Sequence, residues 1–201
     1  MKKLASEFLK ILFDKFVWLI ASLCILAITF GADPFKTEKS IPQGAILLGD
    51  IVDLKNCDYN KLQSATTYYN RLKELMGDRY VTGNHEAQSD IEKPYVINGI
   101  AFFHGDSICY GMEESILQRS KKHGAGAIER WFKNKFSQGR KLNDFTENDL
   151  SKYVLGLRRA FFDYQVHTIV MGHIHPNKLI DAKLPFGRVI VVPRGITEIE
   201  I

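Results

Sequence analysis

The feature that most constrains this chain is a polar cluster that recurs at the ends of four predicted strands. Short apolar segments that predict these strands cover residues 45–48, 79–82, 100–104 and 166–171. Each strand end carries a glycine together with side chains that can bind a metal ion: Gly49-Asp50-Ile51-Val52-Asp53, Gly83-Asn84-His85-Glu86, His104-Gly105-Asp106 and Gly172-His173-Ile174-His175. Because open α/β sheets place ligands at the carboxyl ends of their strands, we expect these clusters to share one centre.

The segments between these strands predict an α/β fold. Residues 62–76 and 112–165 have helical spacing, Asn98-Gly99 predicts a hairpin turn, and residues 188–192 predict a further strand. A chain of 201 residues with 45% hydrophobic side chains is long enough for one domain with a substantial core. Its three cysteines stand far apart, which argues against a disulfide scaffold or a zinc ribbon. The net charge of +4 does not specifically imply a nucleic-acid partner.

The N-terminal residues 1–32 differ from the rest of the chain because residues 16–32 carry no charge. A run of 17 apolar residues is at the lower limit for crossing a bilayer, and the lysines before it favour a cytoplasmic N-terminus. We therefore expect a membrane anchor over residues 1–32, followed by one domain over residues 33–201. The localisation that this predicts is membrane-associated through a single segment and otherwise cytoplasmic. The alternative is an amphipathic helix over residues 3–20 that leads into a buried strand over residues 23–30.

The candidate ligands form a mixed oxygen and nitrogen set: Asp50, Asn84, His104, His173 and His175. Such a set suits Mn, Fe, Co or Zn better than calcium or magnesium, which prefer oxygen alone. Each motif by itself is weak, since a Gly-Asp after a strand is usually a turn and a lone histidine usually belongs to the core. The ordered set of four motifs is what favours a metal site.

In this order the motifs resemble those of the calcineurin-like metallophosphoesterases, over about residues 45–195. The resemblance implies a β-sandwich flanked by helices, with a di-metal centre at one edge, and manganese is the metal that we expect there. It implies that Asp50 bridges the two metals and that His175 binds the second one. The remaining ligands of the first metal would be Asn84, His104 and His173.

The same resemblance implies roles for two residues that do not bind metal. His85 would stabilise the transition state or protonate the leaving group, and Asp53 would orient His85. A carboxylate behind a histidine fixes its tautomer and favours its cationic form. The implied activity is metal-dependent hydrolysis of a phosphomonoester, phosphodiester or pyrophosphate bond by a metal-activated hydroxide.

The chain departs from the family pattern at its first motif. The family begins with D-x-H, whereas the nearest candidate here is Asp33-Pro34-Phe35. We therefore expect one tight metal site and a second, weakened one. The alternative function is a catalytically impaired phosphoesterase fold that acts as a binding or scaffold protein, although the retained His85 argues against it.

The segment between His104 and His173 predicts a helical cap insertion over about residues 112–165, with eleven Lys and Arg against seven Asp and Glu. One interpretation is a cap whose cations recruit a phosphorylated substrate. That substrate is either an amphiphilic, lipid-linked molecule or a nucleotide, and the lipid-linked case would include a membrane as a partner. The other interpretation is an amphipathic helical pair with a solvated basic face. Residues 104–109 resemble the UDP-2,3-diacylglucosamine hydrolase branch of the family. Leu54-Lys55 differs from the Arg-Gly of the protein-serine/threonine phosphatase branch.

Overall fold

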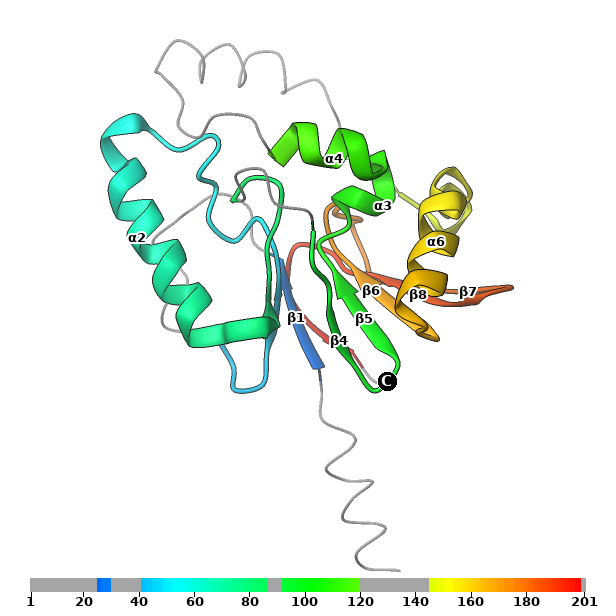
Figure 1. Ribbon diagram of the computed structural model, residues 1–201. Coiled ribbons are helices and arrows are strands. Elements are labelled where there is room, and N and C mark those ends of the chain that lie inside the picture. The colour runs from blue at the N-terminus through cyan, green and yellow to red at the C-terminus, as the bar shows by residue number, and fades with distance from the viewer. Residues whose placement is uncertain (1–24, 30–40, 87–91, 120–144, 200–201) are drawn as a thin grey trace, which may run out of the picture.

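Two β-sheets with helices on their outer faces form the mixed α/β fold, as the sequence predicted (Figure 1). The structure is a computed structural model that describes residues 25–29, 41–86, 92–119 and 145–199. Side chains are described for all of these except residues 25–29, 117–119 and 196.

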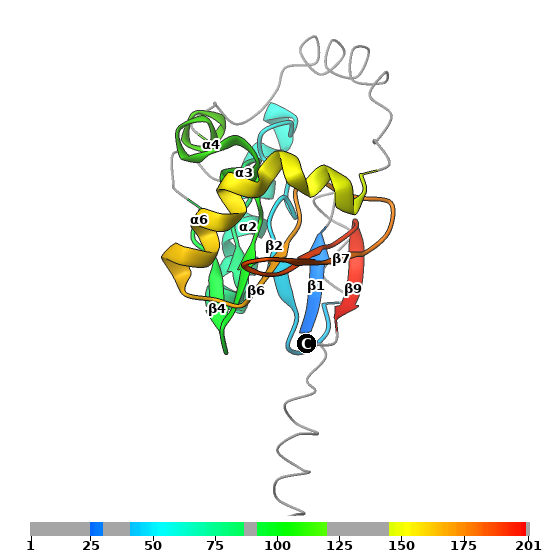
Figure 2. The same cartoon turned by 90° about the vertical axis from the view of Figure 1, so that its right-hand side faces the viewer.

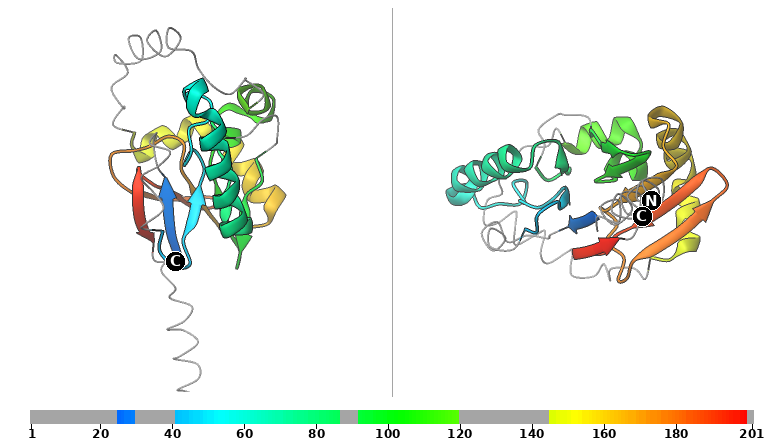
Figure 3. Two further views of the ribbon diagram at one scale, coloured as in Figure 1. Left: turned by 90° about the vertical axis from the view of Figure 1, so that its left-hand side faces the viewer. Right: turned by 90° about the horizontal axis from the view of Figure 1, so that it is seen from below.

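The first sheet has four strands in the order β3-β2-β1-β9. Strand β1 pairs in parallel with β2, and β2 pairs in parallel with β3, whereas β9 runs antiparallel to β1. Helix α2 lies along the outer face of this sheet, as the left-hand view of Figure 3 shows. The elements are β1 (Ile25–Thr29), β2 (Ile46–Leu48), α2 (Tyr59–Met76), a short 3-10 turn η1 (Gly77–Arg79), β3 (Tyr80–Val81) and β9 (Gly195–Ile199).

The second sheet has five strands in the order β4-β5-β6-β8-β7. Its three central strands are parallel, and both edge strands are antiparallel to their neighbours. Its strands are β4 (Tyr95–Ile97), β5 (Ile100–Phe103), β6 (Thr168–Met171), β7 (Ile180–Leu184) and β8 (Gly187–Val191). The helices between β5 and β6 are α3 (Asp106–Tyr110), α4 (Met112–Arg119), the 3-10 helix η2 (Glu147–Tyr153) and α6 (Val154–Tyr164).

Three apolar clusters hold these layers together. The inner cluster joins the two sheets, with Leu48 of β2 and Phe102 of β5 both fully buried. A second cluster packs α2 on the four-stranded sheet, and a third packs α6 on the five-stranded sheet through Leu157 and Phe161 (Figure 2). Helix α6 falls within the predicted cap insertion, yet its apolar face covers a sheet. The basic residues 121–141 of that insertion lie outside the described residues.

The prediction of a membrane anchor is wrong. Within the described residues, no helix is long and apolar enough to cross a membrane. The last part of the uncharged run forms strand β1, whose backbone pairs with β2 on one side and β9 on the other. A central strand of a covered sheet is as apolar as a membrane segment, so hydropathy alone does not separate the two. Strand β1 falls within the strand that the alternative placed over residues 23–30. The helix that the alternative placed over residues 3–20 lies outside the described residues.

The other predicted strands and the hairpin are confirmed, with each strand boundary within two residues of its prediction. Asn98 and Gly99 both have positive φ angles, 51° and 73°, as a type I′ turn requires. Strands β7 and β9 were not predicted. In β7 the burial alternates, with Ile180 and Ala182 inside and Asp181 and Lys183 outside, which is the period-2 pattern of a strand with one exposed face.

Candidate metal centre

The carboxyl ends of four parallel strands bring the predicted ligands together. Asp50 follows β2, Asn84 follows β3, His104 follows β5 and His173 follows β6. Asp50, His104 and His173 each offer one ligand atom, and these atoms lie within 4.8 Å of one another. The amide oxygen of Asn84 lies 3.1 Å from Nε2 of His104. We call these four residues the donor cluster.

His104 stands at the middle of the donor cluster and is fully buried. Its Nδ1 lies 2.8 Å from the carbonyl oxygen of Leu48, so Nδ1 carries a proton and donates it across the two sheets. The other ring nitrogen, Nε2, is 2.9 Å from Nδ1 of His173, 3.1 Å from Oδ1 of Asn84 and 3.4 Å from Oδ2 of Asp50. A backbone carbonyl that fixes the far nitrogen is typical of histidines that bind a metal.

These separations fit a shared cation. With metal bonds of about 2.0–2.1 Å, neighbouring ligand atoms stand roughly 3–3.4 Å apart. A single proton at Nε2 of His104 cannot make a well-aligned hydrogen bond to all three facing atoms, whereas one cation between them can interact with each. The donor cluster therefore fits a borderline divalent metal, with two imidazoles, one carboxylate and one amide.

The backbone is strained at this site. Asp50, His173 and His175 have φ angles of 53°, 61° and 52°, in the left-handed region that non-glycine residues rarely adopt. Strain of this kind costs on the order of 1–3 kcal/mol per residue and is concentrated at functional sites. The two other non-glycine residues with positive φ among those described, Asn98 and Gln165, lie in a hairpin turn and at a helix end.

Two glycines let the ends of β2 and β3 approach each other. A Cβ atom on Gly83 would lie 2.2 Å from Oδ1 of Asp50, and one on Gly49 would lie 2.5 Å from the backbone nitrogen of Gly83. Gly49 also has a φ of 73°. These contacts leave no room for a side chain, which explains why the polar motifs carry glycine at these positions.

The charges of the donor cluster are strongly coupled. Burial would raise the pKa of Asp50, but the charge and hydrogen bond of His104 and the neighbouring His85 hold it well below its usual range. Burial likewise opposes the charge on His104, yet Asp50 raises its pKa to about 10. Burial and the charge on His104 lower the pKa of His173 to about 3, so His173 is neutral. An anionic Asp50 and a neutral His173 are the forms that bind a metal, whereas a metal ion would have to displace the proton from Nε2 of His104.

His85 and Asp53 form a second unit beside the donor cluster. Nδ1 of His85 lies 2.8 Å from Oδ1 of Asp53, and the His85 backbone N–H donates to Oδ1 of Asp50 at 2.8 Å. Burial lowers the pKa of His85, but Asp53 and Asp50 raise it above its ordinary value. The side chain of His85 remains 31% exposed. Since Nδ1 is engaged with Asp53, Nε2 is the nitrogen left to act on a ligand.

His175 does not join the donor cluster. Among the described residues it belongs to no group of three or more acidic, histidine or cysteine side chains that could hold a metal. Its Nδ1 is buried and has no hydrogen-bond partner in the part of the chain that is described. Burial and the charge of Arg194 lower its pKa to about 4. The first-motif candidates Asp33 and Phe35 lie outside the described residues.

Three residues at the site had no predicted role. Asn56 donates through Nδ2 to both oxygens of Asp53, at 3.1 and 2.9 Å. Glu86, the last residue of the second motif, and Glu92 are buried carboxylates that accept backbone N–H groups. Asn56 stands three residues after Asp53, at the spacing of a local side-chain-to-backbone bond. The sequence carried no comparable signal for Glu92.

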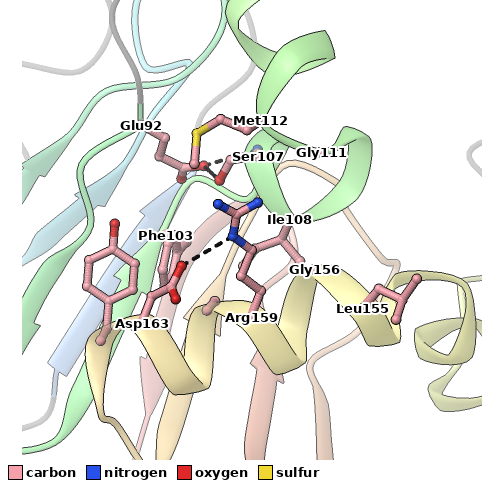
Figure 4. A pocket seen from close by; sticks show the side chains of 12 residues that line it. Glu92, Phe103, Ser107, Ile108, Gly111, Met112, Leu155, Gly156, Arg159 and Asp163 are labelled. Atoms are coloured by element: carbon pink, nitrogen blue, oxygen red, sulfur yellow. Dashed lines mark hydrogen bonds and ion pairs between the residues drawn. The ribbon is translucent and has the colours of Figure 1, made fainter.

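A separate cavity of about 240 Å³ lies between α3 and α6. Figure 4 shows Glu92 against Ser107 on one side, and Arg159 paired with Asp163 on the other. Glu92 accepts from the backbone of Gly105 at 2.8 Å and from the Ser107 hydroxyl at 2.5 Å. None of the predicted site residues lines this cavity.

No protein-family model matches the chain, and no curated protein matches it significantly. The case for a function therefore stands on the geometry of the site and on the order of its motifs.

Proposed function

We propose that the chain is a metal-dependent phosphoesterase with the four-layer, helix-flanked sandwich of the calcineurin-like metallophosphoesterases. The observation that carries the proposal is the convergence of Asp50, Asn84 and His173 on Nε2 of His104, within 3.4 Å. The His85–Asp53 pair stands directly beside it. A metal site suits hydrolysis of an anionic ester when a partly exposed histidine with a raised pKa lies next to it.

The donor cluster would hold one divalent ion, with manganese favoured and iron, zinc or cobalt as further candidates. When bound, such an ion offsets the charge of the phosphoryl oxygens and lowers the pKa of water. The chain contributes the rigid frame for this chemistry. Leu48 fixes the ring of His104, and the strained backbone at Asp50 and His173 directs their side chains inward.

His85 would act on the leaving group. Asp53 holds Nδ1 of His85, and Asn56 in turn holds Asp53, so the imidazole cannot rotate freely. The raised pKa favours the protonated form of His85, which can donate the proton at Nε2 to the oxygen of the departing alcohol or phosphate. The substrate is a phosphomonoester, a phosphodiester or a pyrophosphate.

Hydrolysis of p-nitrophenyl phosphate and of its bis-ester tests this proposal. We expect turnover with manganese, loss of turnover with a chelator, and a decrease in kcat of about 10²–10⁴-fold in His85→Ala at unchanged metal content. The matched control is His167→Ala, because His167 precedes β6 at the end opposite His173. Wild-type turnover in His85→Ala would remove His85 from the mechanism. Metal binding without turnover on either ester would instead favour the binding or scaffold protein.

A further inference from the structure

Glu86 is a buried carboxylate with an unusual set of partners. It is only 2% exposed, and no lysine, arginine or histidine of the described residues forms an ion pair with it. Burial and the nearby Asp50 raise its pKa, and hydrogen bonds from three neighbouring groups oppose that shift. The Tyr80 hydroxyl donates to Oε1 at 2.5 Å, the Val52 backbone N–H donates to the same oxygen at 2.8 Å, and the Gly83 backbone N–H donates to Oε2 at 3.0 Å.

The two backbone donors belong to two different loops of the site. Val52 lies between Asp50 and Asp53 in the loop after β2, and Gly83 directly precedes Asn84 in the loop after β3. A single side chain therefore joins the loop of the bridging carboxylate to the loop of the amide ligand. The contact is close, because the space between Gly83 and Asp50 does not admit a Cβ atom.

This arrangement requires a carboxylate. The Val52 and Gly83 N–H groups point at different oxygens of Glu86, so both oxygens must accept. A glutamine has the same shape but only one acceptor oxygen, and its NH2 group would face one of the two N–H donors. One loop would then carry an unpaired, buried backbone N–H.

We infer that Glu86 is a positioning residue that holds the loops of Asp50 and Asn84 at the separation needed to bind one metal ion. The inference rests on the proposed metal site. It predicts that the loss of one acceptor oxygen weakens metal binding although Glu86 does not itself touch the metal. Loss of such an outer partner typically weakens metal affinity by about 10–100-fold.

Cobalt titration of the full chain tests this inference, with the visible absorption of bound Co(II) as a readout of ligand geometry besides activity. We expect Glu86→Gln to bind cobalt about 10–100-fold more weakly than wild type and with an altered spectrum. The matched control is Tyr80→Phe, which removes a hydrogen bond from the same carboxylate but leaves both loops attached. Its cobalt spectrum and affinity should match wild type. A change seen only in Glu86→Gln then reports the position of the loops and not a general loss of stability.

An unchanged cobalt affinity and spectrum in Glu86→Gln would overturn the inference and leave the proposed function standing. Absence of cobalt binding in wild type would overturn the proposed function, and this inference with it. If Glu86→Gln does not fold, Glu86→Asp takes its place, since it keeps the charge and both oxygens but is one methylene shorter. We expect weaker cobalt binding there too, because the shorter side chain cannot reach both loops, and wild-type binding would contradict the inference.

Discussion

His175 lies two residues after His173 of the donor cluster, but the protein surrounds the cluster and His175 very differently. His104 at the centre of the cluster is fully buried, and its ring is fixed by Leu48 and faced by three further donors. His175 has an unpaired, buried Nδ1 and no comparable set of neighbours among the described residues.

The difference follows from how each is built. The donor cluster takes one residue from each of four strand ends in two packed sheets, so the core that joins the sheets also fixes the distances between ligands. His175 comes from the same loop as His173, and a metal bound at His175 would need further ligands from other segments of the chain. We therefore expect one tightly held metal and a second that binds only at high free metal.

The largest effect that we expect is from His104→Ala. This change removes the residue on which the other three donors converge. The affinity for the tight metal should therefore fall by more than the roughly 10–100-fold that is typical when an outer hydrogen-bond partner is lost. The measurement is metal content after gel filtration, with circular dichroism as a check on folding. A variant that still holds one equivalent of metal would show that His104 is a core residue and not a ligand.

A smaller effect is expected from His175→Ala. Since His175 is not among the residues whose ligand atoms lie within 4.8 Å of one another, the tight metal should remain at wild-type affinity. The concentration of free manganese that gives half-maximal turnover should increase. Calorimetry of wild type and variant measures both quantities. Two equally tight ions in wild type, with both lost in the variant, would contradict the contrast between the two regions.

The smallest effect concerns the backbone at His175. Its φ angle of 52° is unfavourable for any residue with a Cβ atom. We expect His175→Gly to be more stable than His175→Ala by about 1 kcal/mol, because both lack the ring and only glycine adopts this conformation without strain. Urea unfolding of the two variants measures the difference. Equal free energies of unfolding would mean that the loop relaxes when the ring is removed.

Much of the fold was predictable because its signals are local. A glycine and a polar residue that end a short apolar segment mark the end of a strand, and Asn98-Gly99 marks a hairpin, whatever the rest of the chain does. The meeting of Asp50 with Asn84, and of His104 with His173, was predictable as well, since the carboxyl ends of neighbouring parallel strands share an edge of their sheet. The meeting of the two pairs depends on how the two sheets pack. Strand β7 was missed although its alternation of buried and exposed residues was present.

Long-range pairing determined the rest. Residues 25–29 have the hydropathy of a membrane segment, and only their pairing with β2 and with β9 near the C-terminus makes them a central strand. The sequence alone determined which residue types stand at the strand ends, and therefore which metals and which chemistry suit the site. The tertiary structure decided that Glu86 is buried between two loops and that Nδ1 of His175 is buried without a hydrogen-bond partner among the described residues. Burial and hydrogen-bond partners depend on which distant segments pack together.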